Sequence, residues 1–269
     1  MRQKQRFTQK HALLTLAIKT GAIVAKIALI TGASGGLGQA MAKKLLLNDW
    51  QLILVGRDAE KLSAAYQQNH TQIVADCSTL AGVQQLFAAL KTANLVPNAL
   101  AHCVGNIRLG ALHRMAETDF MDCMQANLFS AFYTLAGFTN LLKETKLAGS
   151  AVFVSSAAAR IGTPNHEAIA AAKGGLEALV RSAAATYASA NIRINVVAPG
   201  LLDTPAAAKI LSSDLTREMA AKQYPIAGIG NADDVADLMT WLLGESAARV
   251  TGQVWGIDGG FTSVRPIVK

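Results

Sequence analysis

Short apolar runs rich in β-branched residues alternate along the chain with longer segments in which apolar side chains recur at helical spacing. The apolar runs are nearly continuous, which is typical of strands buried on both faces of a sheet. Strands that alternate with helices in this way predict a single α/β domain with a doubly wound parallel sheet of about seven strands. The predicted strands are Lys26–Ile30, Gln51–Val55, Gln72–Val74, Ala99–Val104, Ala151–Val154, Ile192–Val197 and Gln253–Ile257, and the predicted helices are Leu37–Leu47, Ala59–Gln67, Ala81–Leu90, Glu117–Leu141, Asn165–Ala188 and Asp233–Leu243.

The composition fits a folded domain with a large buried core. Of the 269 residues, 51% are hydrophobic and 16% are charged, which excludes a disordered chain. The three cysteines, Cys77, Cys103 and Cys123, stand far apart and form no CxxC pair. We interpret them as buried thiols rather than disulfides or metal ligands, so we expect no metal site and a reducing, cytoplasmic location.

The formal net charge of +7 is concentrated at the N-terminus. Residues 1–26 hold six basic side chains and no acidic one, which leaves 19 basic and 18 acidic side chains in the rest of the chain. A nucleic-acid-binding domain carries a basic face of its own, so we expect no nucleic-acid partner.

The N-terminal segment itself has several interpretations. Its basic stretch precedes an apolar one, which is the order of a secretory signal. The apolar runs are broken by Lys19 and Lys26 and are too short to span a membrane. We treat residues 1–25 as a basic and apolar extension, or as the product of a start codon placed too early, and residues 26–269 as one domain. A surface-associated amphipathic helix is the alternative.

A glycine-rich loop lies between the first predicted strand and the first predicted helix. Glycines at its tight turns let the backbone approach a pyrophosphate, and the unpaired N–H groups at the start of the helix favour an anion. A loop in this context predicts dinucleotide binding. The residues expected to bind the dinucleotide are Gly32, Ser34, Gly35, Gly36, Leu37 and Gly38.

The end of the second predicted strand indicates which dinucleotide is bound. In dinucleotide folds the residue about 20 positions beyond the loop meets the adenosine ribose, and an acidic side chain there binds the 2′-hydroxyl of NAD. This chain has Gly56 and Arg57 at that point, and a guanidinium pairs well with a 2′-phosphate. The sequence therefore favours NADP(H) over NAD(H).

Several further motifs are spaced along the chain in a characteristic order. They are the TGxxxGxG loop at Thr31, Val74-Ala75-Asp76-Cys77, His102-Cys103-Val104-Gly105, Gln125-Ala126-Asn127-Leu128, Ser156, Lys173, Pro199-Gly200-Leu201-Leu202-Asp203-Thr204, Thr251-Gly252-Gln253 and Asp258-Gly259-Gly260. In this order the chain resembles the short-chain dehydrogenase/reductase family from about Lys26 to Phe261. The resemblance implies a Rossmann-type fold and cofactor contacts from Asp76, Cys77, Gly105, Lys173, Pro199, Gly200, Leu202 and Thr204. Of the family's NNAG, however, only the glycine at 105 is present.

The same resemblance breaks at the centre of the expected chemistry. The family's YxxxK is Ile169-Ala170-Ala171-Ala172-Lys173 here, so the tyrosine that exchanges a proton with the substrate is replaced by Ile169. Lys173, Asn127 and Ser156 match the family's other catalytic residues. The resemblance implies that Lys173 binds the nicotinamide ribose and keeps a positive charge near the reacting oxygen.

His166 is the candidate for the missing proton donor. It precedes Lys173 by seven residues, so both lie on the same face of a helix. The enoyl-reductase branch of the family has its tyrosine at this offset, and histidine titrates close to physiological pH. The alternative is that His166 is a first-turn residue that faces solvent or a neighbouring subunit.

Two classes of function follow from these residues. The first is an NADP(H)-dependent oxidoreductase with an altered proton donor, acting on a small and mostly apolar carbonyl, alcohol or conjugated enone or enoyl substrate. The second is an NADP(H)-binding sensor or scaffold without turnover. The apolar segment Thr204–Tyr224 is expected to cover the substrate, and the family resemblance implies a homo-oligomer, with a tetramer expected through helices Glu117–Leu141 and Asn165–Ala188.

Overall fold

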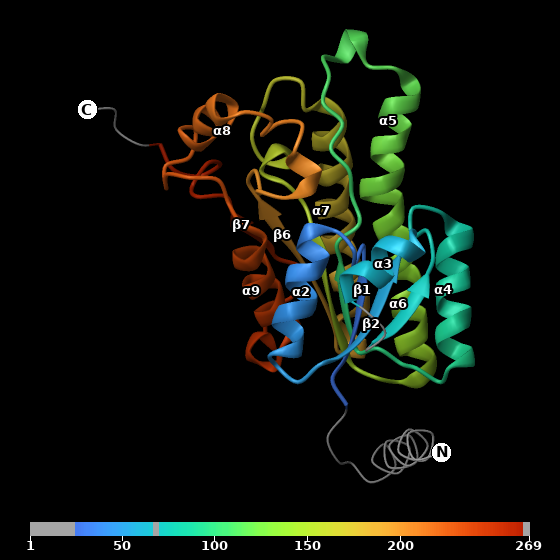
Figure 1. Cartoon of the computed structure of the whole chain (residues 1–269). Helices are drawn as coiled ribbons and strands as arrows, with labels where there is room; N and C mark the ends of the chain where they lie inside the picture. The colour runs from blue at the N-terminus through green and yellow to red at the C-terminus, as the bar shows by residue number, and fades with distance from the viewer. Residues whose placement is uncertain (1–24, 67–69, 266–269) are drawn as a thin grey trace.

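The computed structural model describes residues 25–66 and 70–265, and a parallel sheet of seven strands forms the centre of this part of the chain (Figure 1). The strand order is β3-β2-β1-β4-β5-β6-β7, so the chain reverses its direction of travel across the sheet between β1 and β4. Ligands of such sheets bind outside the carboxyl ends of the strands at this reversal. The strands are β1 (Ile27–Thr31), β2 (Gln51–Gly56), β3 (Thr71–Val74), β4 (Ala99–His102), β5 (Gly149–Val154), β6 (Ile192–Pro199) and β7 (Val254–Ile257).

Helices cover both faces of the sheet, as the continuous apolar strands predict. One face packs against α2 (Gly36–Leu46), α3 (Ala59–Tyr66) and α9 (Ala232–Leu243). The other face packs against α4 (Leu80–Thr92), α6 (Ser130–Thr145) and α7 (Glu167–Tyr187). Successive residues of a strand point into the hydrophobic cores on opposite faces of the sheet. Leu29 packs in the core on the α6 side, and Ile30 packs in the core on the α2 side. The predicted doubly wound fold is confirmed.

Most predicted elements are correct to within two residues at each end. The largest strand differences lie at the carboxyl edge of the sheet, where the predicted strand Ala99–Val104 already ends at His102 and the predicted strand Ile192–Val197 continues to Pro199. β5 ends at Val154, so Pro199 pairs with β7 alone and its missing N–H group leaves no gap in the ladder.

The predicted continuous helix Glu117–Leu141 is wrong in one respect. It is interrupted after α5 (Glu117–Met124) by a π-helical turn, η2 (Gln125–Phe129), and α6 then continues to Thr145. Such turns insert an extra residue into the helical ladder and are frequent at functional sites. Here the turn contains Asn127, whose amide nitrogen donates to the carbonyl of Cys123 at 2.9 Å.

The segment between β6 and α9 extends beyond the carboxyl end of the sheet. It contains the short helix α8 (Asp214–Ala221), which begins with a reciprocal capping box between Ser213 and Thr216 (Figure 1). No residue of α8 is buried. Within the described residues, none of the helices combines the length and apolar character that crossing a membrane requires. The predicted extension, residues 1–25, lies outside the described residues except for its last residue.

Candidate active site

The glycine-rich loop turns at the carboxyl end of β1 and leads directly into α2. Gly32 has φ +68°, and a Cβ on it would stand 2.8 Å from the carbonyl carbon of Cys103. A Cβ on Gly38 would stand 2.3 Å from the carbonyl oxygen of Gly32. Gly35 is the N-cap of α2 and offers no side chain to the first N–H groups of the helix. The loop therefore needs glycine where it occurs and leaves donors free for an anion.

A second segment lies over this loop. β6 ends at Pro199, and the following residues bring Thr204 and Pro205 to Gly36, where each would be 3.2 Å from an added Cβ. Gly200 lies against Tyr224, whose hydroxyl accepts a hydrogen bond from the backbone N–H of Leu201 at 2.7 Å. Of the predicted residues in this segment, Thr204 therefore lies beside the phosphate loop, whereas Pro199 pairs with Ile257, Gly200 lies against Tyr224 and Leu202 bridges to Gly230.

The tip of β2 lies next to the same loop. The hydroxyl oxygen of Ser34 is 3.5 Å from the position that a Cβ on Gly56 would take. Arg57 follows Gly56 and is exposed, and among the described residues no ion pair or hydrogen bond engages its side chain. The carboxylate of Asp58 instead interacts with α3, because it accepts a hydrogen bond from the backbone N–H of Lys61 at 3.0 Å. An exposed guanidinium and a serine hydroxyl on either side of Gly56 are groups that bind phosphate well.

The predicted adenine-side residues follow β3. One carboxylate oxygen of Asp76 accepts from the backbone N–H of Ser78 at 2.9 Å and from its hydroxyl at 2.7 Å. Cys77 is buried, and burial raises the pKa of its thiol to about 12. The aspartate is therefore held in place, and the cysteine packs as a neutral side chain.

Three of the predicted residues meet in one cluster beyond the ends of β4 and β5. A Cβ on Gly105 would stand 2.7 Å from Oδ1 of Asn127 and 3.5 Å from Nζ of Lys173. Asn127 comes from the π-helical turn, and Lys173 comes from the middle of α7. Both side chains are buried. The fold therefore brings the Lys173 ammonium and the Asn127 amide close to Gly105, where a side chain would collide with Asn127.

Burial sets the ionisation of this cluster. It lowers the pKa of Lys173 to about 8, and the ammonium is held by a 2.7 Å hydrogen bond to the carbonyl of Val154. Burial and the charge of Lys173 lower the pKa of His102 to about 3, so this histidine is neutral. Burial raises the pKa of the Cys103 thiol to about 12. The cluster is therefore largely buried, and Lys173 is its one titratable cation.

Two further predicted positions lie on the elements that carry this cluster, Ile169 on α7 and Ser156 just after β5. Ile169 is only 5% exposed and packs in an apolar cluster with Cys123, Ala168 and Ala172. Ser156 is partly exposed, and its hydroxyl accepts from the backbone N–H of Ala158 at 3.2 Å as the cap of a short helical turn. Within the described residues, no hydrogen bond joins Ser156 to Lys173 or Asn127.

His166 is the N-cap of α7 and is partly exposed. Its Nδ1 lies 2.7 Å from the carbonyl oxygen of Pro164, which places the ring proton on that nitrogen and leaves Nε2 free. In the part of the chain described, His166 makes no hydrogen bond to Lys173 or Asn127. His166 makes no side-chain capping hydrogen bond, and its partial exposure fits both sequence alternatives, a proton donor and a first-turn residue that faces solvent or a neighbouring subunit.

Sequence reasoning missed a polar network next to the site. Asn127 donates to the side-chain oxygen of Asn106 at 2.9 Å, and Asn106 donates to Asp122 at 2.9 Å. Arg108 pairs with the same carboxylate at 2.6 Å. Asn106, Asp122 and Arg108 belong to no motif, so only the fold brings them to Asn127.

Sequence reasoning also missed two buried hydrogen-bonded groups, the ring of His102 and the Ser155–Glu177 pair. His102 bridges the hydroxyls of Thr31 and Ser130 at 2.9 and 3.1 Å. The hydroxyl of Ser155 donates to the buried carboxylate of Glu177 at 2.8 Å. A polar residue inside an apolar strand was the available signal for His102, because such a group requires hydrogen-bond partners.

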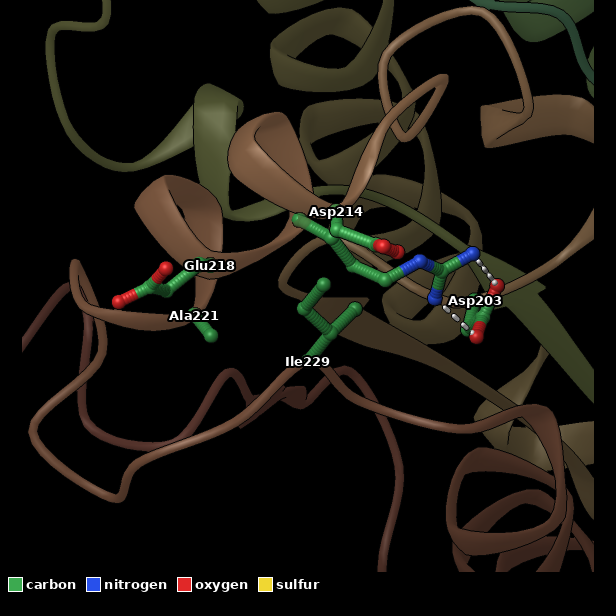
Figure 2. Close-up of a pocket in the computed structure, with 6 residues that line it drawn as sticks. Asp203, Asp214, Glu218, Ala221 and Ile229 are labelled. Atoms are coloured by element: carbon green, nitrogen blue, oxygen red, sulfur yellow. Dashed lines mark hydrogen bonds and ion pairs between the residues drawn. The ribbon is translucent and has the colours of Figure 1, made fainter.

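A hollow of about 390 Å³ lies beside the segment that follows β6, and Figure 2 draws the residues that line it. Arg217 on α8 reaches across it to Asp203 with both terminal nitrogens, one of them 3.2 Å from Oδ1. Asp214, Glu218, Ala221 and Ile229 complete the lining. Four of the six residues that line this hollow are charged, and none of them belongs to the Lys173 cluster.

Comparison with known proteins identifies relatives across nearly the whole domain. Residues 32–262 match a family described as "Enoyl-(Acyl carrier protein) reductase". A 2-(R)-hydroxypropyl-CoM dehydrogenase of Xanthobacter autotrophicus is 30% identical over 257 residues, which is 90% of this chain and all of the relative. Carbonyl reductase family member 4 of Danio rerio is 29% identical over 242 residues, covering 88% of this chain and 98% of the relative.

Solved structures give the same result. The Pseudomonas aeruginosa RhlG/NADP active-site complex is 28% identical, with a TM-score of 0.83 over 88% of this chain and 96% of the other. A short-chain type dehydrogenase/reductase from Mycobacterium ulcerans is 25% identical, with a TM-score of 0.82 over 88% and 90%.

Proposed function

The chain belongs to the short-chain dehydrogenase/reductase family, and from this premise we propose that it is an NADP(H)-dependent oxidoreductase with an altered proton donor. One observation carries the proposal. The cluster of Gly105, Asn127 and Lys173 stands near the ends of β4 and β5, and the glycine-rich loop that starts at β1 is in backbone contact with Cys103. The chain thus keeps both a place for a dinucleotide and a buried cation where chemistry would occur.

The residues present fit NADP(H). Gly38 lets α2 pack against the backbone of Gly32 and Ala33, so that the tight loop can form, and the start of α2 offers N–H donors for an anion. Arg57 and Ser34 would hold the 2′-phosphate, and Thr204 would contact the nicotinamide end. When bound, NADP(H) supplies the hydride that is transferred. The RhlG structure named above is a complex with NADP, which supports the same choice.

The proton chemistry must differ from that of the family, because Ile169 has no proton to donate. We assign the donor role to His166, whose Nδ1–H is held by the carbonyl of Pro164. Nε2 would donate its proton from the imidazolium form, which leaves the neutral ring with its proton on Nδ1. Lys173 lies two helical turns further along α7 on the same face. It would orient the nicotinamide ribose and stabilise negative charge on the reacting oxygen. Asn127 holds the wall of the site, and Ser156 would bind a substrate oxygen.

The substrate class follows from the surroundings and from the relatives. Exposed apolar side chains stand near this end of the domain, among them Ile107, Leu109, Ile161 and Leu215. We propose a small and mostly apolar carbonyl, alcohol, enone or enoyl compound. An enone suits the site because its enolate requires electrostatic stabilisation more than a strong acid. Relatives are named as a carbonyl reductase and as dehydrogenases, and the matched family is described as an enoyl reductase.

We also propose a homo-oligomer, with a tetramer expected. α6 and α7 carry an apolar hollow of about 350 Å³ lined by Leu128, Phe129, Phe132, Tyr133 and Leu179. Phe132 is 51% exposed in the single chain, which is costly for a large aromatic side chain that has no partner. Pairing of these helices with a second copy would cover it.

A second candidate function is cofactor binding without turnover. The observation that favours it is the burial of Ile169, which fills the position of the family's tyrosine with an apolar side chain. The deciding experiment is NADPH consumption against a panel of ketones, enones and enoyl thioesters. We expect consumption with at least one member. Tight NADPH binding with no consumption on any of them would favour the sensor or scaffold.

A further inference from the structure

The chain makes a tight turn immediately before α7, at residues 163–166. The backbone N–H of His166 donates to the carbonyl of Thr163 at 3.3 Å, which closes the turn. Pro164 is the second residue of the turn, and its ring holds φ at about −65°. Asn165 is the third residue and has φ +63°. A turn with these two dihedral angles is of type II, and proline followed by asparagine suits it.

The positive φ of Asn165 sets the direction of the peptide unit between Pro164 and Asn165. The second residue has ψ of about +120° in a type II turn and about −30° in a type I turn, so its carbonyl points to opposite sides of the turn in the two types. Here the carbonyl oxygen of Pro164 lies 2.7 Å from Nδ1 of His166. A type I turn would direct this carbonyl away from the ring.

Hydrogen bonds fix the rest of the turn, so this peptide unit is the part that can flip. The carbonyl of Asn165 accepts from the backbone N–H of Gly110 at 3.0 Å, and the carbonyl of His166 accepts from the N–H of Ala170 at 2.8 Å. The side chain of Asn165 is exposed, and within the described part of the chain its amide makes no hydrogen bond. Asn165 therefore contributes its backbone conformation and not its amide.

The peptide unit decides which nitrogen of His166 is protonated. A carbonyl oxygen only accepts, so Nδ1 carries the proton that faces Pro164, and Nε2 of the neutral ring is bare. We propose that Asn165 is a positioning residue, whose left-handed backbone aims the Pro164 carbonyl at Nδ1 and thereby reserves Nε2 for proton exchange with the substrate. The exchange with the substrate rests on the proposed function of His166.

Four variants separate the backbone of Asn165 from its side chain. Asn165→Gly removes the amide but adopts a positive φ readily, so it should keep the type II turn. Asn165→Val places a β-branched residue where a positive φ is strongly disfavoured and should flip the peptide unit, and Asn165→Ala makes the same change more mildly. Asn94→Val is the matched control, because Asn94 is also exposed and has φ +51° but follows α4.

The direct readout is the tautomer of His166 in the protein without cofactor. It is measured by nitrogen NMR of the histidine-labelled chain at a pH where the ring is neutral, and the signal is identified by its absence from His166→Ala. The unaltered chain, Asn165→Gly and Asn94→Val should show a protonated Nδ1 and a bare Nε2. Asn165→Val should show both tautomers, and Asn165→Ala should show them to a smaller extent. An unchanged tautomer in Asn165→Val and Asn165→Ala, or mixed tautomers in Asn165→Gly, would overturn the proposal.

The catalytic consequence is measured as NADPH oxidation on the best substrate of the panel. Asn165→Val should lose about tenfold in kcat, which is less than the loss for His166→Ala, and keep its KM for NADPH. Asn165→Gly and Asn94→Val should keep the parental kcat. An undiminished kcat in an Asn165→Val protein that shows both tautomers would overturn the catalytic part of the proposal. If no substrate were turned over, the proposed function would fail, while the NMR comparison would still decide whether Asn165 sets the tautomer.

Discussion

The ammonium of Lys173 donates a 2.7 Å hydrogen bond to the carbonyl of Val154, the last residue of β5. This contact fixes a cation from the middle of α7 at the carboxyl edge of the sheet. The side chain is only 6% exposed, and the cost of burying a charge is visible in a pKa lowered to about 8. A charge kept at such a cost indicates a functional site more than a structural contact.

Replacing Lys173 by methionine should therefore stabilise the protein while removing its function. Its pKa falls from the usual 10.5 to about 8 on folding, which corresponds to a cost of about 3 kcal/mol at pH 7. Loss of the hydrogen bond to Val154 costs about 1 kcal/mol and so offsets part of the stability gained by removing the buried charge. We expect Lys173→Met to be about 1–3 kcal/mol more stable to urea at pH 7, and to bind NADPH more weakly.

The pH dependence gives the control for this prediction. Between pH 8 and pH 10.5 the unfolded chain holds a proton that folded Lys173 has released, so this group's contribution to stability rises with pH across the window. The advantage of Lys173→Met should shrink over the same window. A variant that is less stable than the parent at every pH would show that burial of the amine costs little.

Arg57 should decide between the two nicotinamide cofactors. Replacing it with alanine removes the exposed guanidinium at the tip of β2 and should weaken NADPH binding by about 1.5–3 kcal/mol. NADH binding should hardly change, because NADH has no 2′-phosphate. Lys61→Ala, which removes a nearby exposed cation on α3, is the control and should affect neither cofactor. Equal losses for both cofactors in a fluorescence titration would refute the assignment.

Phe132 should report on the oligomer. A charge placed in the α6–α7 hollow would be buried by a second copy, so Phe132→Asp should dissociate the assembly. Leu47→Asp is the matched control, since Leu47 is 74% exposed at the end of α2. Light scattering at micromolar concentration should give a multiple of the 28.2 kDa chain mass for the parent and for Leu47→Asp only. A monomeric parent would contradict the proposal.

Restoring a phenol tests the framework around Ile169. Ile169→Tyr should create or raise carbonyl reductase activity on a generic ketone by about 10²–10⁴-fold, because Asn127, Ser156 and Lys173 match the family's other catalytic residues. The larger side chain must enter a packed apolar cluster, so the variant should lose about 1–3 kcal/mol of stability. Ile169→Phe carries the same ring without the hydroxyl and should show the stability loss alone. Equal activity of the two variants would mean that the phenol finds no productive geometry.

The fold was readable from the sequence because it depends on periodicity and glycine. Buried parallel strands are continuous apolar runs. Gly32 and Gly38 stand where a side chain would collide with backbone, and a side chain on Gly36 would press against Thr204 and Pro205. The π-helical turn at Asn127 was not predicted, because a single extra residue in a helical ladder produces no distinct pattern of apolar positions over so short a stretch.

Side-chain partnerships were less predictable than the motifs. Lys173 and Asn127 carried a recognisable spacing, whereas Asp122, Arg108 and Asn106 meet only because a loop returns to α5. The pairing of Arg217 with Asp203 spans 14 residues of a loop without periodicity, so no pattern indicates it. Such contacts are set by tertiary geometry, which local sequence does not encode.

The most direct test of the account is the behaviour of His166→Ala in an NADPH oxidation assay on the best substrate of the panel. If His166 donates the proton, His166→Ala should bind NADPH as tightly as the parent and lose at least about 10²-fold in turnover. His70→Ala, which alters a histidine at the start of β3 far from α7 in sequence, should retain full turnover. Undiminished turnover by His166→Ala would contradict the relocated proton donor and pass that role to Lys173 or to water.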